Sequence, residues 1–169
     1  MNRTMKRWTL NETGRQNLKL TEAEIPQPGQ NEVLVRVNAV ALNYRDKVII
    51  EGGMGNGMPM PFTPGSDMAG GVEAVGPGGT RFRPGDRVIS SFNADWIDGK
   101  LENNAANPHY NTLGYAIQGV LAEYVVMREA WLVAAPRTLN DAQASTLVCA
   151  GLTAWFALVA VSYTHLRAH

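Results

Sequence analysis

The chain has 169 residues, of which 45% are hydrophobic and 18% charged, so it has enough apolar side chain for a folded core and too little charge for a disordered chain. Its 15 basic residues balance its 15 acidic residues to a net charge of +0, which excludes electrostatic binding of nucleic acid or of an anionic membrane as its main activity. We expect a small, weakly charged partner.

The cysteine content and the apolar stretches bear on the redox environment and on membrane insertion. Cys149 is the single cysteine, which excludes an internal disulfide, and no apolar run follows the basic residues near the start, so a reducing, cytoplasmic location without a signal peptide is expected. The longest apolar stretch, Leu147–Val161, has 15 residues. Because a membrane span needs about 18 or more, this stretch predicts a buried helix.

Turn residues dominate most of the chain and predict many short strands. Ten of the 17 glycines lie between Gly52 and Gly79, and all nine prolines lie between Pro26 and Pro136. Frequent turns between short β-branched runs are typical of a small barrel or sandwich. The candidate strands are Met5–Leu10, Leu18–Glu24, Glu32–Leu42, Gly71–Val75, Arg87–Ser91, Leu121–Met127 and Trp131–Ala134.

The clearest strand leads into a short helix. In Glu32–Leu42, valine and alanine at every second position share one face, as a half-buried strand requires. The segment Tyr44–Ile50 contains no glycine or proline and is followed by Gly52 and Gly53, which predicts a helix with a glycine stop.

The composition changes after Pro136, where alanine becomes frequent and turn residues nearly disappear. Asn140 and Asp141 are both suited to cap a helix there. The sequence predicts a mainly β unit over 1–136 and a helical connector over 137–161. Residues 162–169 depart from this pattern; they are either a foreign or frame-shifted tail or a natural polar helix end.

Two glycine-rich stretches have a structural interpretation. In PGSDMAGGVEAVGPG the glycines bracket a short strand and let other backbone approach closely. In FRPGDRV, Pro84 and Gly85 predict a turn, and Asp86 is placed to accept hydrogen bonds from nearby backbone amides.

Four stretches together carry a family resemblance. ALNYRDKVIIEGG, PFTPGSDMAGGVEAVGPGGTRFRPGDRVIS, GVLAEYVVM and STLVCAGLTAWFAL resemble, in order and distance, segments of the medium-chain dehydrogenase/reductase superfamily, the alcohol dehydrogenase and quinone oxidoreductase group. The resemblance implies a mainly β, GroES-like, partly open β-barrel on the substrate side, followed by a Rossmann domain that binds NAD(P)H. This chain is then expected to hold the barrel and only the helical start of a truncated second domain.

The resemblance also bears on metal binding. Zinc-dependent members carry a cysteine where this chain has Asn43, a His-Glu pair where it has Ser66 and Asp67, and a further ligand near Cys149. One thiolate, one carboxylate and a serine hydroxyl are a poor ligand set for catalytic zinc. The segment 91–119, where many relatives hold a structural zinc, has no cysteine. We expect no zinc at either site.

The segment NYRD resembles the Asn-x-x-Asp segment of zinc-independent quinone and enoyl reductases, which faces nicotinamide and substrate. The resemblance makes Asn43 and Tyr44 candidate catalytic residues, since an amide and a phenol can steady negative charge on a carbonyl oxygen. Asn43, Tyr44 and Thr153 are the candidate cofactor-binding residues, and structural roles stay open for all three. Arg45 and Asp46 are expected to pair with each other or to cap the helix.

The remaining aromatic residues have more than one interpretation. Trp155 and Phe156 are expected on an apolar helix face that packs two domains together. Trp96, Tyr110 and Tyr115 lie in the polar segment 93–118, which either shapes a substrate mouth or is a solvated loop.

Together these features predict the N-terminal part of a zinc-independent oxidoreductase. The full-length enzyme is expected to use NAD(P)H, that is NADH or NADPH, in hydride transfer to or from a carbonyl, quinone or activated alkene. No glycine-rich dinucleotide fingerprint follows residue 160, so the chain by itself is expected to be inactive and prone to aggregate. The expected partners are a small-molecule substrate and, at full length, a second copy in a homodimer. The alternative is a GroES-like binding or assembly module without turnover.

Overall fold

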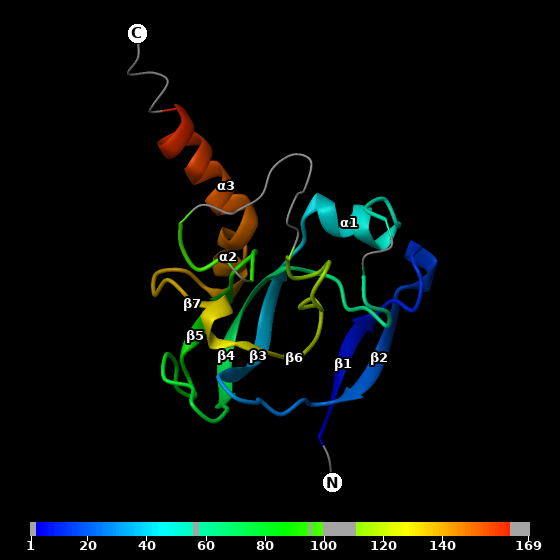
Figure 1. Ribbon diagram of the computed structural model, residues 1–169, viewed down its shortest axis with the longest axis horizontal. Coiled ribbons are helices and arrows are strands. Elements are labelled where there is room, and N and C mark those ends of the chain that lie inside the picture. Colours follow the sequence, from blue (N-terminus) through cyan, green and yellow to red (C-terminus); the bar gives the residue numbers. More distant parts are fainter. Residues whose placement is uncertain (1–2, 56–57, 95, 100–110, 163–169) are drawn as a thin grey trace.

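The computed structural model describes residues 3–55, 58–94, 96–99 and 111–162, which form two antiparallel β-sheets and several short helices. A two-stranded sheet pairs β1 with β2, and a five-stranded sheet has the order β6-β3-β4-β5-β7 (Figure 1). No continuous ladder joins the two sheets within these ranges, which agrees with a partly open barrel. The strands are β1 (Thr4–Thr9), β2 (Lys19–Glu24), β3 (Glu32–Ala41), β4 (Asp67–Val75), β5 (Arg87–Ser90), β6 (Tyr124–Arg128) and β7 (Leu132–Ala134).

The main core lies on one face of the five-stranded sheet. Val33 and Val35 of β3 are fully buried and pack with Met68 of β4, Val88 of β5 and Met127 of β6. The alternating valines of β3 therefore face the core, as expected. The pairing of β3 with β4 shifts register twice, so β3 is bent rather than flat.

Helix α1 (Tyr44–Ile50) follows β3 directly and has the predicted bounds. The C-terminal helical run begins with α2 (Asp141–Ser145) and continues through a π-helical turn (Leu147–Gly151), α3 (Leu152–Trp155) and a second π-helical turn (Phe156–Ser162). Of the two caps that the sequence allowed, Asn140 is the one used: its Oδ1 accepts a hydrogen bond from the backbone N–H of Gln143 at 2.9 Å. Two single 3-10 turns cover Arg15–Asn17 and Glu129–Trp131.

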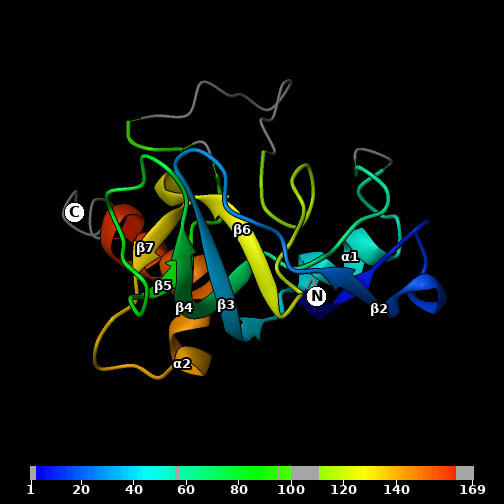
Figure 2. The same cartoon turned by 90° about the horizontal axis from the view of Figure 1, so that it is seen from below.

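The helices meet the sheets at one end of the molecule. Figure 1 shows α1 and α3 at the same end, beyond the strands, and Figure 2 shows α2 against the five-stranded sheet. Ala144 and Val148 are buried against Ala69 of β4 and Ile89 of β5. This contact brings the start of the C-terminal run close to the strand ends that carry the candidate residues.

The stretch Leu147–Val161 differs from its prediction as a buried helix. Val148 is buried, but Leu152, Trp155 and Leu158 are 53%, 58% and 69% exposed. Beyond Cys149 the helical run points away from the five-stranded sheet (Figure 1), so the apolar side chains of α3 and of the turn after it lie in solvent. No helix in the described ranges is both long enough and apolar enough to span a membrane.

The segment 93–118 also differs from a simple solvated loop. Thr112 and Leu113 are buried, and Leu113 belongs to the main core. The Tyr115 hydroxyl donates to the carbonyl of Met54 at 2.9 Å, so this ring is held in place. Trp96 is 47% exposed, and Tyr110 lies outside the described residues.

Candidate functional site

The backbone at the end of β3 fixes the position of the NYRD segment. Asn43 is extended and precedes the first helical residue. Its N–H donates to Asp46 Oδ2 at 2.8 Å, and the Asp46 N–H donates to the Asn43 carbonyl at 3.0 Å. Asp46 caps α1 in this way, one of the two roles expected for it.

Asn43 and Tyr44 lie in different surroundings although they are consecutive. Asn43 Nδ2 is buried and has no hydrogen-bond partner in the part of the chain that the structure describes. Tyr44 is 78% exposed, and its ring lies 5.9 Å from the Lys47 ammonium. The first residue therefore offers an unsatisfied donor from the interior, and the second offers a phenol on the surface.

A cavity of about 490 Å³ lies beside α1 and includes Asn43 and Asp46 in its lining. Trp8 and Leu18 of the β1–β2 unit and Leu42 before α1 give it a mainly apolar wall. Charged residues stand at its edge: Glu51 accepts from Arg15 at 2.8 Å and from Lys47 at 2.6 Å. The hydrogen bond from Lys47 is the main cause that lowers the pKa of Glu51.

Arg45 forms no ion pair with Asp46, which was one of the two roles expected for it. Its guanidinium donates to Thr112 Oγ1 at 2.8 Å and to the Leu113 carbonyl at 3.0 Å, and it lies 4.7 Å from the ring centroid of Phe92. Burial lowers the pKa of Arg45, while the charge of Asp46 opposes that shift. Arg45 thus anchors α1 to the segment 112–113 and places a cation at this end of the fold.

A buried polar cluster joins β4 to the C-terminal helical run. Asp67 is fully buried; its Oδ1 accepts from the Ser66 hydroxyl at 2.5 Å, and its Oδ2 accepts from the Cys149 N–H at 3.0 Å. The side chain of Thr153 lies near the Cys149 thiol and acts to lower its pKa. Thr153 itself is exposed, and no hydrogen bond links it to Asn43 or Tyr44 among the described residues.

The pKa values of Cys149, in this cluster, and of Asp46, on α1, are both raised. Burial raises the pKa of the Cys149 thiol, and the negative charge of Asp67 raises it further, while the side chain of Thr153 acts in the opposite direction. Burial also raises the pKa of Asp46, against the effect of its hydrogen bond from Asn43. Cys149 is therefore a protonated, weakly nucleophilic thiol, in agreement with a packing role.

The donor set at these positions does not fit a catalytic zinc ion. Asp67 uses both carboxylate oxygens in hydrogen bonds within the protein, and Cys149 favours its protonated form. The Arg45 cation lies close enough to interact with both. Because zinc requires deprotonated thiolate, imidazole or free carboxylate ligands, no step of the chemistry is assigned to a metal here. No group of three or more His, Cys, Asp or Glu residues in the described ranges could hold one.

The sequence pointed to the NYRD segment, but it did not reveal two long-range contacts at this end of the fold. The interaction of Arg45 with Thr112 and Leu113 spans 67 and 68 positions, and the bond from Cys149 to Asp67 spans 82. No local pattern reveals such contacts. The available signal was an aspartate, Asp67, directly before an apolar, glycine-rich stretch, because a carboxylate that such a stretch draws into the interior requires donors from elsewhere in the fold.

Comparison with known proteins identifies the class of protein to which this partly open barrel belongs. Residues 29–137 match the alcohol dehydrogenase GroES-like domain. The chain belongs to the medium-chain dehydrogenase/reductase superfamily.

Curated relatives carry related activities in their names. A zinc-type alcohol dehydrogenase-like protein of Schizosaccharomyces pombe is 38% identical over 85% of this chain and 41% of its own length. A chloroplastic quinone-oxidoreductase of Triphysaria versicolor is 35% identical over 86% of this chain and 38% of its own length. The chain therefore spans about two fifths of the length of these relatives.

Solved structures give the same fold. A crystal structure described as that of an alcohol dehydrogenase from Sinorhizobium meliloti has a TM-score of 0.91 and 53% identity, covering 96% of this chain and 48% of that one. A thermostable alcohol dehydrogenase from Pyrobaculum aerophilum with bound cobalt and zinc has a TM-score of 0.80 and 34% identity, covering 95% and 49%. Metal-binding relatives thus share the barrel.

Proposed function

We propose that this chain forms the substrate-side part of a zinc-independent, NAD(P)H-dependent oxidoreductase that acts on a carbonyl, quinone or activated alkene. The apolar cavity of about 490 Å³ beside α1 carries the proposal, because it combines room for a small molecule with Asn43 and Asp46 in its lining. Its volume lies within the roughly 300–1,000 Å³ of small-molecule sites. Its apolar wall suits a weakly charged substrate.

Asn43 is proposed to bind an incoming carbonyl oxygen. Its buried Nδ2 has no partner among the described residues, and leaving a buried donor unsatisfied costs about 1–3 kcal/mol. A ligand carbonyl that accepts this bond removes that cost. Tyr44 is exposed and free to donate its phenol to a ligand that approaches α1 from outside the domain.

Thr153 is proposed to contact the cofactor from the opposite side. It is exposed on α3, where the run leaves the barrel, and it lies near the thiol of Cys149, whose backbone N–H donates to Asp67. When bound, a nicotinamide supplies the hydride; Asn43, Tyr44 and Thr153 bind and orient the reacting groups. The cofactor domain itself is expected outside this chain, which by itself should not turn over NAD(P)H.

A chimera tests the proposed activity. Residues 1–160 replace the matching part of the Sinorhizobium meliloti protein, which is 53% identical to this chain, and NAD(P)H oxidation is measured with alkenals, quinones and aldehydes. We expect turnover, and a fall in kcat of about tenfold or more for Asn43→Ala and for Tyr44→Phe. Tyr124→Phe, which removes a hydroxyl on β6, is the matched control and should leave kcat unchanged. Proven cofactor binding without oxidation of any substrate would contradict the proposal.

Metal analysis tests zinc independence separately. We expect purified chain and chimera to retain far less than one zinc per chain, and activity to survive chelation. Near-stoichiometric zinc would overturn this part of the proposal without affecting the fold. The homodimer and the cytoplasmic location expected from the sequence stay predictions.

A further inference from the structure

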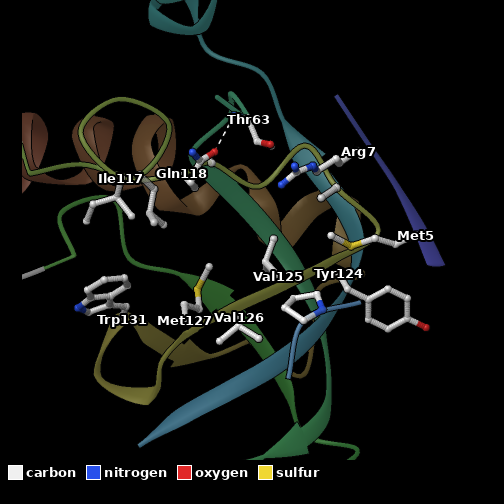
Figure 3. Close-up of a pocket in the computed structure, with 14 residues that line it drawn as sticks. Met5, Arg7, Thr63, Ile117, Gln118, Tyr124, Val125, Val126, Met127 and Trp131 are labelled. Atoms are coloured by element: carbon white, nitrogen blue, oxygen red, sulfur yellow. Dashed lines mark hydrogen bonds between the residues drawn. The ribbon is translucent and has the colours of Figure 1, made fainter. Parts of the chain in front are cut away.

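A second cavity lies between β1, β6 and the segment 113–119, and it shares no lining residue with the cavity beside α1. Its volume is about 210 Å³. Most of its wall is apolar, with Met5 from β1, Met127 from β6, and Ile117 and Trp131 (Figure 3). An engineered apolar cavity of about 150 Å³ holds benzene, so this cavity has room for a single ring with a small substituent.

Arg7 places a cation in this apolar cavity. Its Nε is buried without a hydrogen-bond partner, and its guanidinium has no ion pair or hydrogen bond to the described residues. By contrast, Arg87 is bonded to Asp141, and Arg81 to Glu129. Arg7 is half-buried, and a buried donor such as its Nε is costly when it has no acceptor, so an anion in the cavity would supply the missing acceptor.

None of the polar side chains that line this cavity is bonded to Arg7 in the described part of the chain. Gln118 Oε1 accepts from the Thr63 N–H at 2.8 Å, and Gln118 Nε2 donates to the Pro61 carbonyl at 2.8 Å. These bonds to the backbone hold the Gln118 amide in place. Figure 3 shows Arg7, Thr63 and Gln118 at one end of the lining, and Met127 and Trp131 toward the other. The lining contains no carboxylate and no second cation.

We infer that this cavity binds a small aromatic or branched aliphatic monocarboxylate. The planar guanidinium matches a carboxylate in two parallel hydrogen bonds, and the Thr63 hydroxyl stands at the same end as a further donor. The methionines and Trp131 suit an apolar body. A dicarboxylate would bring a second charge into the wall without a cation to meet it, and inorganic phosphate would leave the apolar end empty.

Equilibrium dialysis of the 169-residue chain against benzoate tests the inference, with benzamide as the neutral analogue of nearly the same shape. We expect saturable binding of benzoate, and binding of benzamide weaker by about tenfold or more, because the charge-assisted hydrogen bonds are lost. Equal binding of the two compounds, or no saturable binding of benzoate at millimolar concentration, would overturn the inference. Neither measurement depends on cofactor or turnover, so failure here is distinguishable from failure of the proposed function.

Substitutions then locate the site. Arg7→Met keeps the apolar stem and removes the charge, and we expect it to weaken benzoate binding by about tenfold or more. Lys6→Met removes one positive charge from the adjacent, exposed position of β1 and should leave the affinity unchanged. Equal losses in both variants would show that overall charge, rather than the cavity, attracts benzoate. If Arg7→Met does not fold, the benzoate and benzamide comparison in the unaltered chain decides.

Discussion

Asp46 combines a structural role with an unfavourable charge. It is 3% exposed, it caps α1 through Oδ2, and its Oδ1 has no partner within the described residues. Burial raises its pKa above the ordinary value of 3.8. The ionised carboxylate therefore destabilises the folded state relative to the protonated acid. The contribution of Asp46 to stability is fully present below pH 3.8 and is lost as the pH rises through the folded-state pKa.

Asp46→Asn should remove this pH dependence. The amide oxygen still accepts from the Asn43 N–H, but it cannot ionise. The free energy of unfolding of both proteins is measured by urea denaturation. The value for the variant minus the value for the unaltered chain should increase as the pH rises from about 3 to 7. A difference that stays constant over this range would show that Asp46 ionises normally in the fold.

Glu51→Gln is the control with the opposite sign. Because the pKa of Glu51 is lowered, chiefly by its hydrogen bond from Lys47, the charge of Glu51 stabilises the fold above pH 4.5, and this contribution is lost as the pH falls. The free energy of unfolding of Glu51→Gln should therefore fall relative to that of the unaltered chain as the pH rises over the same range.

At the scale of elements, consecutive glycines on β4 make different demands. A Cβ on Gly70 would lie 2.2 Å from the carbonyl oxygen of Arg36, a backbone atom of the paired strand β3, whereas a Cβ on Gly71 would meet no atom within 4 Å. We expect Gly70→Ala to lower the free energy of unfolding by about 1–3 kcal/mol, and Gly71→Ala to leave it unchanged or raise it by up to about 1 kcal/mol. Equal effects in urea denaturation would contradict the close approach of β3 and β4.

An ion pair fixes α2 to the five-stranded sheet. The guanidinium of Arg87 on β5 bonds to the Asp141 carboxylate, and Asn38 of β3 donates to its other oxygen at 2.9 Å. Hydrogen bonding from Arg87 is the main cause that lowers the pKa of Asp141. One helix start is thus held by two strands.

Asp141→Asn should loosen this attachment. Buried charged hydrogen bonds contribute about 1.5–3 kcal/mol, but the Arg87 side chain is 37% exposed, so we expect a loss of about 1 kcal/mol in the free energy of unfolding. Amide exchange of residues 142–146 should speed up more than exchange in β3. Asp98→Asn, at an exposed position, is the control, and a loss of equal size there would contradict the argument.

Local signals predicted some elements well. The alternation in β3 and the stop glycines after Ile50 act within a few residues, so β3 and α1 were placed nearly to the residue. The hydrogen bonding predicted for Asp86 is also local: its carboxylate accepts from the backbone N–H of Arg83 at 2.8 Å. By contrast, β4 begins at Asp67 rather than Gly71, because its first half is defined by pairing with the distant β3.

At the scale of the whole molecule, the sequence indicated the correct family, whereas it did not indicate how the candidate residues are arranged in space. Asn43 was placed correctly at the end of a strand, since that depends on local pattern. Asn43 and Tyr44 differ in exposure, and Arg45 donates to Thr112, because segments far apart in the chain pack together here. Family resemblance identifies such a segment, whereas only coordinates give its partners.

The C-terminal helical run leaves a large apolar surface in water. Leu152, Trp155, Phe156 and Leu158 are each more than half exposed on consecutive turns. Contiguous apolar surface of this kind promotes association, because burying it against another surface releases water. We therefore expect the 169-residue chain to self-associate, with an average mass in sedimentation velocity that rises with concentration.

Trp155→Glu combined with Leu158→Glu should shift the chain toward monomer, because both side chains stand on this surface three positions apart. The midpoint of thermal unfolding should change little, since neither side chain is buried in the fold. Leu20→Glu, at a 52% exposed position of β2, is the matched control and should leave association unchanged. If the unaltered chain sediments as a monomer at all concentrations, or if Leu20→Glu disperses it equally well, the helical run is not the associating surface.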